Sequence, residues 1–199
     1  MKEAMQFLSI LFPLSSFFSL LSAILVSYLL GSIPSGVIVS RFLQRDVREV
    51  GSGHTGALNT FRAAGFLPAA FTFLADAGKV VLALEFARAA TGSEWGVALA
   101  AVAAVIGHCL PIYTRFRGGM GLTVAGTALF LLDGPILIAL VLVWFPLRYI
   151  LKRSPRATMV VALLLPVLLA LARAPASILA FGLGAGAVVF VRHLRDWNR

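Results

Sequence analysis

Long apolar segments, separated by short polar ones, run along almost the whole chain of 199 residues. The first segment runs from about Gln6 to Phe42 and is interrupted by Gly31-Ser32-Ile33-Pro34, which predicts a kinked or broken helix. Six further candidate spans follow: Phe66–Ala89, Trp95–Leu110, Leu122–Leu132, Pro135–Leu151, Ala157–Leu171 and Pro175–Val191. Because about 20 apolar residues suffice to cross a bilayer as a helix, the pattern predicts an all-α polytopic membrane helix bundle. We expect about seven transmembrane helices in a single domain over residues 1–199.

Composition supports the membrane assignment. Hydrophobic residues make up 60% of the chain and charged residues 13%, against roughly 25% charged residues in soluble domains. The net charge of +9 comes from basic residues scattered between apolar segments, which argues against a nucleic-acid partner and for the lipid bilayer. The N-terminal MKEAMQ lacks a convincing cleavage site, so we expect a retained anchor.

The basic residues also predict an orientation. If spans alternate, segments 41–65, 111–121, 152–156 and 192–199 lie on one side together with the helix end at Arg148. That side holds 13 of the 17 Lys and Arg residues, the other side holds Lys2, Arg88 and Arg173, and Lys79 lies within a span. The excess of positive charge in cytoplasmic loops then predicts an outside N-terminus and a cytoplasmic C-terminus. The glycine- and histidine-bearing segments would converge on the cytoplasmic face.

The first of these segments is GSGHTGALNTFR, residues 51–62. It fits G-x-G-x-x-G, but a dinucleotide site needs a βαβ unit that an apolar helical chain does not offer. Glycines do allow successive backbone N–H groups to form an anion-binding nest, which a helix N-terminus reinforces. Asn59 and Arg62 would add donors for phosphate oxygens. The alternative is a tight interfacial loop in which glycine serves only the turns.

The other two polar segments are similar in character. His108–Gly121 carries Arg115 and Arg117 before Gly118, Gly119 and Gly121, followed by an apolar helix. The sequence therefore allows a second phosphate-sized anion site at a helix start, or a flexible joint in a basic loop. At the C-terminus, His193 and Asp196 are three residues apart and would share a helix face, so they could pair.

Several other chemistries lack support in the residues. The three histidines are far apart and no paired-cysteine spacing exists, so neither a metal site nor a cofactor is predicted. His108 and Cys109 are adjacent and would point apart on a helix, which argues against a thiol nucleophile. No histidine has an aspartate five residues on, the arrangement of the common glycerolipid acyltransferases. Asp76 and Lys79 lie within a span, where we expect a structural ion pair.

Four stretches together resemble the bacterial acyl-phosphate glycerol-3-phosphate acyltransferases of the PlsY type. They are YLLGSIPSGVIVSR (28–41), DVREVGSGHTGALNTFRAAG (46–65), GHCLPIYTRFRGGMG (107–121) and VRH (191–193). The resemblance implies a seven-span enzyme that moves a fatty acyl group from acyl-phosphate to the 1-hydroxyl of glycerol 3-phosphate, giving lysophosphatidic acid. It implies catalytic roles for Ser52, Arg62 and His193. The substrate-binding positions it suggests are Gly51, Gly53, His54, Gly56, Asn59, Arg115, Arg117, Gly118, Gly119, Gly121 and Asp196.

Four positions depart from the family pattern, and they keep alternatives open. His54 and Asp196 stand where the family has asparagine, Leu58 where it has threonine, and Met120 where it has lysine. The loss of a cation and the gain of a carboxylate would weaken a site for a dianionic acceptor. The alternatives are compensation by Arg115 or Arg117, a different acceptor, lost activity, or a non-catalytic lipid-binding or transport protein. Acyl-chain preference and oligomeric state do not follow from the sequence.

Overall fold

The computed structural model describes residues 2–198, and side chains from residue 13 onward. Helices make up the regular structure of this range, in which no strand occurs. The helices are α1 (Lys2–Ser32), α2 (Ser35–Phe42), η1 (Val47–Glu49), α3 (Ala57–Ala64), α4 (Phe66–Thr91), α5 (Glu94–Cys109), η2 (Ile112–Thr114), α6 (Leu122–Leu151), α7 (Ser154–Leu171) and α8 (Ala176–Leu194). Six of the long helices are apolar enough to cross a membrane.

The predicted break in the first apolar segment is confirmed. Helix α1 ends at Ser32 and α2 begins at Ser35. Pro34 has no N–H to donate, which interrupts the helical ladder at this point. Helix α2 therefore leaves the direction of α1 and leads into the polar segment that follows.

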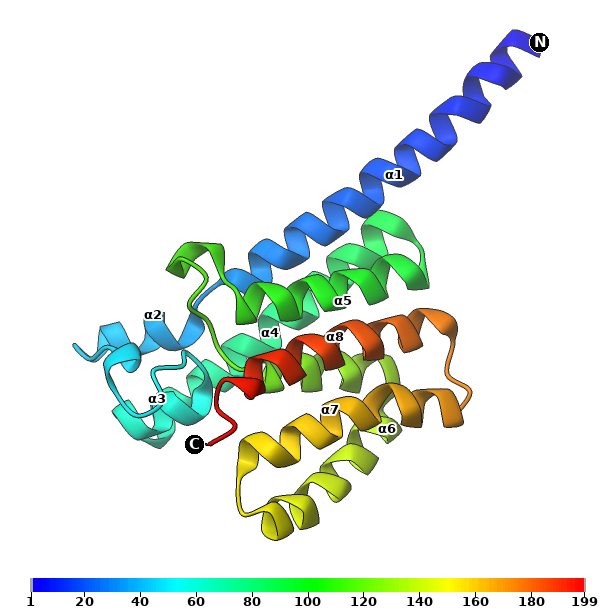
Figure 1. Cartoon of the computed structure of the whole chain (residues 1–199). Helices are drawn as coiled ribbons and strands as arrows, with labels where there is room; N and C mark the ends of the chain where they lie inside the picture. The colour runs from blue at the N-terminus through cyan, green and yellow to red at the C-terminus, as the bar shows by residue number, and fades with distance from the viewer. Residues whose placement is uncertain (1, 199) are drawn as a thin grey trace.

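Helix α6 contains two of the predicted spans. Its 30 residues would be about 45 Å long if straight. Asp133, however, has the non-helical torsions φ −157° and ψ 83°, and Leu122 and Leu151 line the same cavity. The helix thus folds back at Asp133 (Figure 1). The Asp133 Oδ1 accepts a hydrogen bond from the Ile136 N–H at 3.2 Å. With the two limbs counted separately, the seven predicted segments are present.

The remaining boundaries agree within a few residues, with two differences. Helix α7 begins at Ser154 rather than Ala157, because Pro155 in the first turn has no N–H that a helix would need to bond. Helix α3 lies within a stretch that the sequence analysis treated as a loop. Its eight residues follow the glycine-rich turn directly, so the segment contains a helix N-terminus.

Helix α5 forms the centre of the bundle. In the 18 residues of α5 that are most suited to span a membrane, 67% is buried inside the protein, compared with 17–39% in the other candidate spans. It packs closely on α1, because a Cβ on Gly31 would lie 2.3 Å from Ala104 O and one on Gly107 would lie 2.2 Å from Tyr28 O. Such small residues let membrane helices approach at backbone distance.

The polar connections gather at one end of the bundle, as predicted. Figure 1 shows the α2–α3 region, the α6–α7 connection and the C-terminal end of α8 at this end. The short α4–α5 and α7–α8 connections lie at the opposite end (Figure 1). The orientation of these two ends in a membrane stays a prediction.

Candidate active site

A cavity of about 850 Å³ lies where the polar segments meet. Its walls come from residues 52–62, His108 at the end of α5, both ends of α6, the start of α7 and the C-terminal end of α8. The predicted site residues that line it are Ser52, His54, Gly56, Asn59, Arg62, Gly121, His193 and Asp196. The four departures from the family pattern, including Leu58 and Met120, line it as well.

Asn59 holds the first polar segment in shape. Its buried Nδ2 donates to Val47 O at 2.7 Å, to Val50 O at 2.9 Å and to His54 O at 2.9 Å. Its Oδ1 accepts from the Ser52 N–H at 3.0 Å. The Asn59 side chain therefore holds this loop in one conformation, and we call it the brace of the loop. A direct contact of Asn59 with substrate stays a prediction.

The turn at Gly51 depends on glycine for two reasons. Gly51 has φ +59°, in the left-handed region, and a Cβ here would lie 2.5 Å from Asn59 Oδ1 and 3.3 Å from Arg62 Cδ. A side chain would be strained and would push Asn59 away. Gly51 thus lets Asn59 and the stem of Arg62 close over the turn.

The expected nest of backbone amides is only partly available, which corrects the sequence analysis. The Ser52 N–H donates to Asn59 and the Gly53 N–H donates to Val50 O at 3.0 Å, so neither amide is open to an anion. The first turn of α3 is the part of the segment that faces the cavity instead, since Gly56, Ala57 and Leu58 line it. A helix N-terminus offers N–H groups and partial positive charge to an anion.

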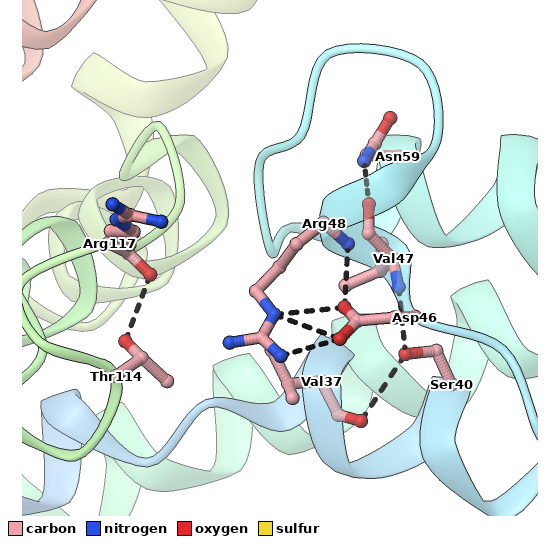
Figure 2. Close-up of polar contacts among 8 residues, drawn as sticks. All are labelled: Val37, Ser40, Asp46, Val47, Arg48, Asn59, Thr114 and Arg117. Atoms are coloured by element: carbon pink, nitrogen blue, oxygen red, sulfur yellow. Dashed lines mark hydrogen bonds and ion pairs between the residues drawn. The ribbon is translucent and has the colours of Figure 1, made fainter.

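A chain of hydrogen bonds ties this brace to α2 (Figure 2). The Val47 N–H donates to Ser40 Oγ at 3.2 Å, and Ser40 donates to Val37 O at 3.3 Å. Beside it, Asp46 accepts from the Arg48 N–H and from the Arg48 guanidinium at 2.9 Å (Figure 2). The hydrogen bonds with Arg48 lower the pKa of Asp46 to about 2.

The glycines of the second polar segment pack directly on His108. A Cβ on Gly118 would lie 2.2 Å from His108 O, and one on Gly119 would lie 2.1 Å from His108 Nε2. The Gly118 and Gly119 carbonyls accept from Arg192 at 3.1 and 3.2 Å. These two residues and Gly53 do not line the cavity, so their substrate-binding role stays a prediction.

Arg115 and Arg117 lie on the exposed side of the same segment. Neither lines the cavity, and the Arg117 carbonyl accepts from Thr114 Oγ1 at 2.9 Å (Figure 2). Their part in substrate binding, and the compensation for Met120 that was one of the alternatives, stay predictions.

The sequence analysis missed a group of polar residues at the α6–α7 connection. These residues line the cavity opposite the first segment: Arg148, Lys152, Arg153, Ser154 and Arg156. Arg148 Nε donates to Ser154 Oγ at 2.6 Å, and Arg156 lies over the Trp197 ring. In the sequence this stretch is a basic loop in which the serine-bearing segment of the family is hard to find, and only the fold brings its residues to the cavity wall.

The intramembrane charges are paired, as predicted. Lys79 Nζ lies 2.8 Å from Asp76 Oδ1, and both side chains are buried. Lys79 also donates to Ile33 O at 3.0 Å and lies 3.0 Å from His108 Nδ1. The pair thereby connects the break between α1 and α2 with a histidine that lines the cavity.

At the C-terminal end, the contact between His193 and Asp196 is made by the backbone, where the Asp196 N–H donates to His193 O at 3.0 Å. His193 Nδ1 lies 2.7 Å from Val189 O, and because a carbonyl only accepts, Nδ1 is the protonated nitrogen. Asp196 Oδ2 lies 2.6 Å from His54 Nε2, on the first polar segment. In the neutral form of His193, Nε2 is therefore the nitrogen that can accept a proton.

A second, apolar cavity of about 220 Å³ adjoins the polar one. The two limbs of α6 together with α7 and α8 enclose it, and it shares Leu122 and Thr158 with the polar cavity. Its other lining residues include Gly126, Leu137, Ala162 and Gly186. An alkyl chain can therefore lie beside the polar site within the bundle.

The chain is similar to known proteins over most of its length. A family model described as "Glycerol-3-phosphate acyltransferase" matches residues 21–199. The glycerol-3-phosphate acyltransferase of Rubrobacter xylanophilus is 39% identical over 171 residues, which are 85% of this chain and 85% of the relative. That of Gloeobacter violaceus is 37% identical over 178 residues, which are 87% of each chain.

The fold is also similar to two solved structures of PlsY, described as an integral membrane glycerol 3-phosphate acyltransferase. Its glycerol 3-phosphate form has a TM-score of 0.81 and 28% sequence identity, and the match covers 91% of both chains. Its lysophosphatidic acid form has a TM-score of 0.78 and 27% identity, also with 91% of both chains covered.

Proposed function

Because the chain belongs to the glycerol-3-phosphate acyltransferase family, we propose that the polar cavity is where an acyl group passes from acyl-phosphate to glycerol 3-phosphate. The protein is a membrane enzyme, and acyl transfer to glycerol 3-phosphate gives lysophosphatidic acid. The observation that carries the site assignment is the convergence of Arg62, the first turn of α3 and His193 on one cavity. The cytoplasmic position of this cavity is part of the proposal.

The donor phosphate would bind at the first turn of α3. Arg62 offers a guanidinium fork, the helix N-terminus offers N–H groups, and Ser52 offers a hydroxyl, all at the cavity wall. The acyl chain would extend into the apolar cavity, which begins at Leu122 and Thr158. Cations that neutralise the phosphate also stabilise it as the leaving group.

The acceptor phosphate would lie against the cations of the α6–α7 connection. Arg148, Lys152 and Arg153 line the wall on that side, and they supply positive charge that Met120 does not. A dianion at this wall would leave its 1-hydroxyl free to point towards His193. The family lysine at position 120 would then have a functional substitute in these residues.

In the transfer step, the acceptor oxygen forms a bond to the acyl carbon and the bond from that carbon to the phosphate oxygen breaks. His193 Nε2 accepts the hydroxyl proton, since Nδ1 is held by Val189 O. Inorganic phosphate leaves with the electron pair of the broken bond. An acyl-phosphate is a mixed anhydride, so positioning and charge neutralisation are sufficient and no covalent enzyme intermediate is required.

An assay of phosphate release tests this function directly. Purified enzyme in detergent, given acyl-phosphate and glycerol 3-phosphate, should form inorganic phosphate and lysophosphatidic acid in equal amounts. Arg62→Ala should lower kcat/KM by about 100-fold or more, as expected when a charged contact to the reacting group is lost. The matched control is Arg88→Ala, because Arg88 is exposed at the end of α4 and pairs with Glu85.

The outcomes separate the claims. Full activity of the Arg62→Ala variant would remove this residue from the site. Product formation from an acyl thioester at the rate seen with acyl-phosphate would contradict the proposed donor. A loss in the Arg88→Ala control as large as that in Arg62→Ala would show that the effect is not specific to the cavity.

A further inference from the structure

Two of the departures from the family pattern contact each other. His54 Nε2 and Asp196 Oδ2 are 2.6 Å apart, although the residues lie 142 positions apart in the chain. Both side chains line the polar cavity. Where the resemblance places two asparagines, this chain has a histidine and an aspartate that form a close pair.

Asp196 would be unfavourable in this cavity without a partner. The residue is 6% exposed, and a buried carboxylate near a bound phosphate dianion repels it through a medium of low dielectric constant. His54 supplies a donor on the side of the first polar segment. The hydrogen bond to His54 holds the carboxylate on the side of the first polar segment, which leaves the rest of the cavity to phosphate.

The pair also joins the two halves of the site. The His54 carbonyl accepts from Asn59 Nδ2 at 2.9 Å, so His54 is fixed to the brace of the first segment. The Asp196 N–H donates to His193 O at 3.0 Å, so Asp196 is fixed to the turn that follows His193. A bond between them therefore sets how far the donor-binding segment lies from the proposed proton acceptor.

We propose that His54 and Asp196 are positioning residues that function as a unit, closing the first polar segment onto the end of α8 and holding the Asp196 carboxylate in one place. The inference rests on the proposed function, because it assigns the pair to the same cavity. It differs from that function in predicting that the two residues depend on each other. Two asparagines can bond to one another as amides, so asparagine at position 54 should be tolerated better when position 196 is asparagine as well.

A double-mutant cycle tests this dependence. His54→Asn replaces the imidazole with a shorter side chain and loosens the hold on the Asp196 carboxylate, so KM for glycerol 3-phosphate should rise by about tenfold with a smaller change in kcat. Asp196→Asn keeps an acceptor for His54 and should change KM by about threefold or less. The double variant should be within about threefold of the wild type, that is, better than His54→Asn alone. Glu85→Gln is the control, because Glu85 is an ion-paired carboxylate outside the cavity.

Thermal unfolding of each variant in detergent separates folding from binding. A double variant that is folded while the His54→Asn variant is not would support mutual dependence, because replacing Asp196 removes the free-energy cost of its buried carboxylate. A double variant that also fails to fold, or one whose losses are the product of the two single losses, would overturn the proposal. An unchanged KM in His54→Asn would overturn it too. Wild-type enzyme without acyl transfer would instead refute the proposed function, so the two failures are distinguishable.

Discussion

At the scale of single residues, one amide side chain fixes the conformation of the candidate donor site. Asn59 contacts three carbonyls and one backbone N–H of the segment before it. It reaches them because Gly51 has no side chain at the point of closest approach. The geometry of the phosphate site thus depends on a residue that need not touch the phosphate.

Gly51→Ala should show this dependence. The added Cβ would lie 2.5 Å from Asn59 Oδ1, at a φ of +59°, so the variant is strained and the brace is displaced. We expect kcat/KM to fall by about tenfold or more, since small misplacements of positioned groups cost that much. The measurement is phosphate release from acyl-phosphate with glycerol 3-phosphate.

Gly78→Ala is the matched control for this prediction. Gly78 is in the middle of α4, and a Cβ there would meet no atom within 4 Å. Alanine is also the better helix former, so this variant should be active and at least as stable as the wild type. Equal activity of the two alanine variants would contradict the role of the Gly51 turn.

The sequence predicted the residues whose chemistry is evident in their own segment. Ser52, Arg62 and His193 line the cavity as expected from their types and motifs. It did not predict the partner of Asp196, because helical spacing pointed to His193 and only the folded chain brings His54 to it. For the same reason, the sequence predicted Arg115 and Arg117 as substrate-binding cations, whereas Arg148 and Lys152 are cations that line the cavity.

At the scale of secondary-structure elements, the reversal within α6 shapes the site. Its first limb begins at Gly121, beside the polar cavity, and its second limb returns to that cavity at Leu151. The sequence predicted this interruption as two separate spans, Leu122–Leu132 and Pro135–Leu151. Helix α3 was not predicted as a separate element, because its eight residues are too few to form a membrane span, yet its first turn lines the cavity.

Asp133 should stabilise this reversal as the cap of the second limb. Its Oδ1 accepts from the Ile136 N–H three residues later, which satisfies one of the N–H groups that have no partner within the first turn of a helix. Asp133→Ala should therefore lower stability by about 1 kcal/mol, measured as a lower midpoint of thermal unfolding in detergent. Asp133→Asn is the control, because asparagine caps helices about as well. Identical midpoints for the two variants would contradict the capping role.

At the scale of the whole molecule, charge and chemistry occupy the same end. The cavity wall includes Arg62 and the basic α6–α7 connection, and the sequence places 13 of the 17 Lys and Arg residues on this side. These residues serve two physical purposes, since they bias the orientation of the chain in the membrane and neutralise phosphate groups. Hydropathy could predict the spans and their alternation. That the same cations also line the cavity could be recognised only from the fold.

This coincidence predicts where the cavity lies in the cell. Cys109 is the only cysteine in the chain and is buried, so Cys109→Ala gives a background without reactive thiols. In that background, Arg195→Cys introduces a thiol near the cavity end and Arg173→Cys one at the opposite end, both at exposed positions. A membrane-impermeant maleimide should label the Arg173→Cys protein in intact cells. It should label the Arg195→Cys protein only in inverted vesicles.

The reverse labelling pattern would place the cavity outside the cell, and the orientation argument would then fail while the acyl-transfer chemistry stood. The predicted pattern has a further physical consequence. A charged acceptor such as glycerol 3-phosphate does not cross a bilayer core, because an unpaired charge there costs several kcal/mol. An enzyme with its polar cavity at the basic end would take this substrate from the aqueous phase on that side, while the apolar cavity between α6, α7 and α8 would receive the acyl chain, as proposed above.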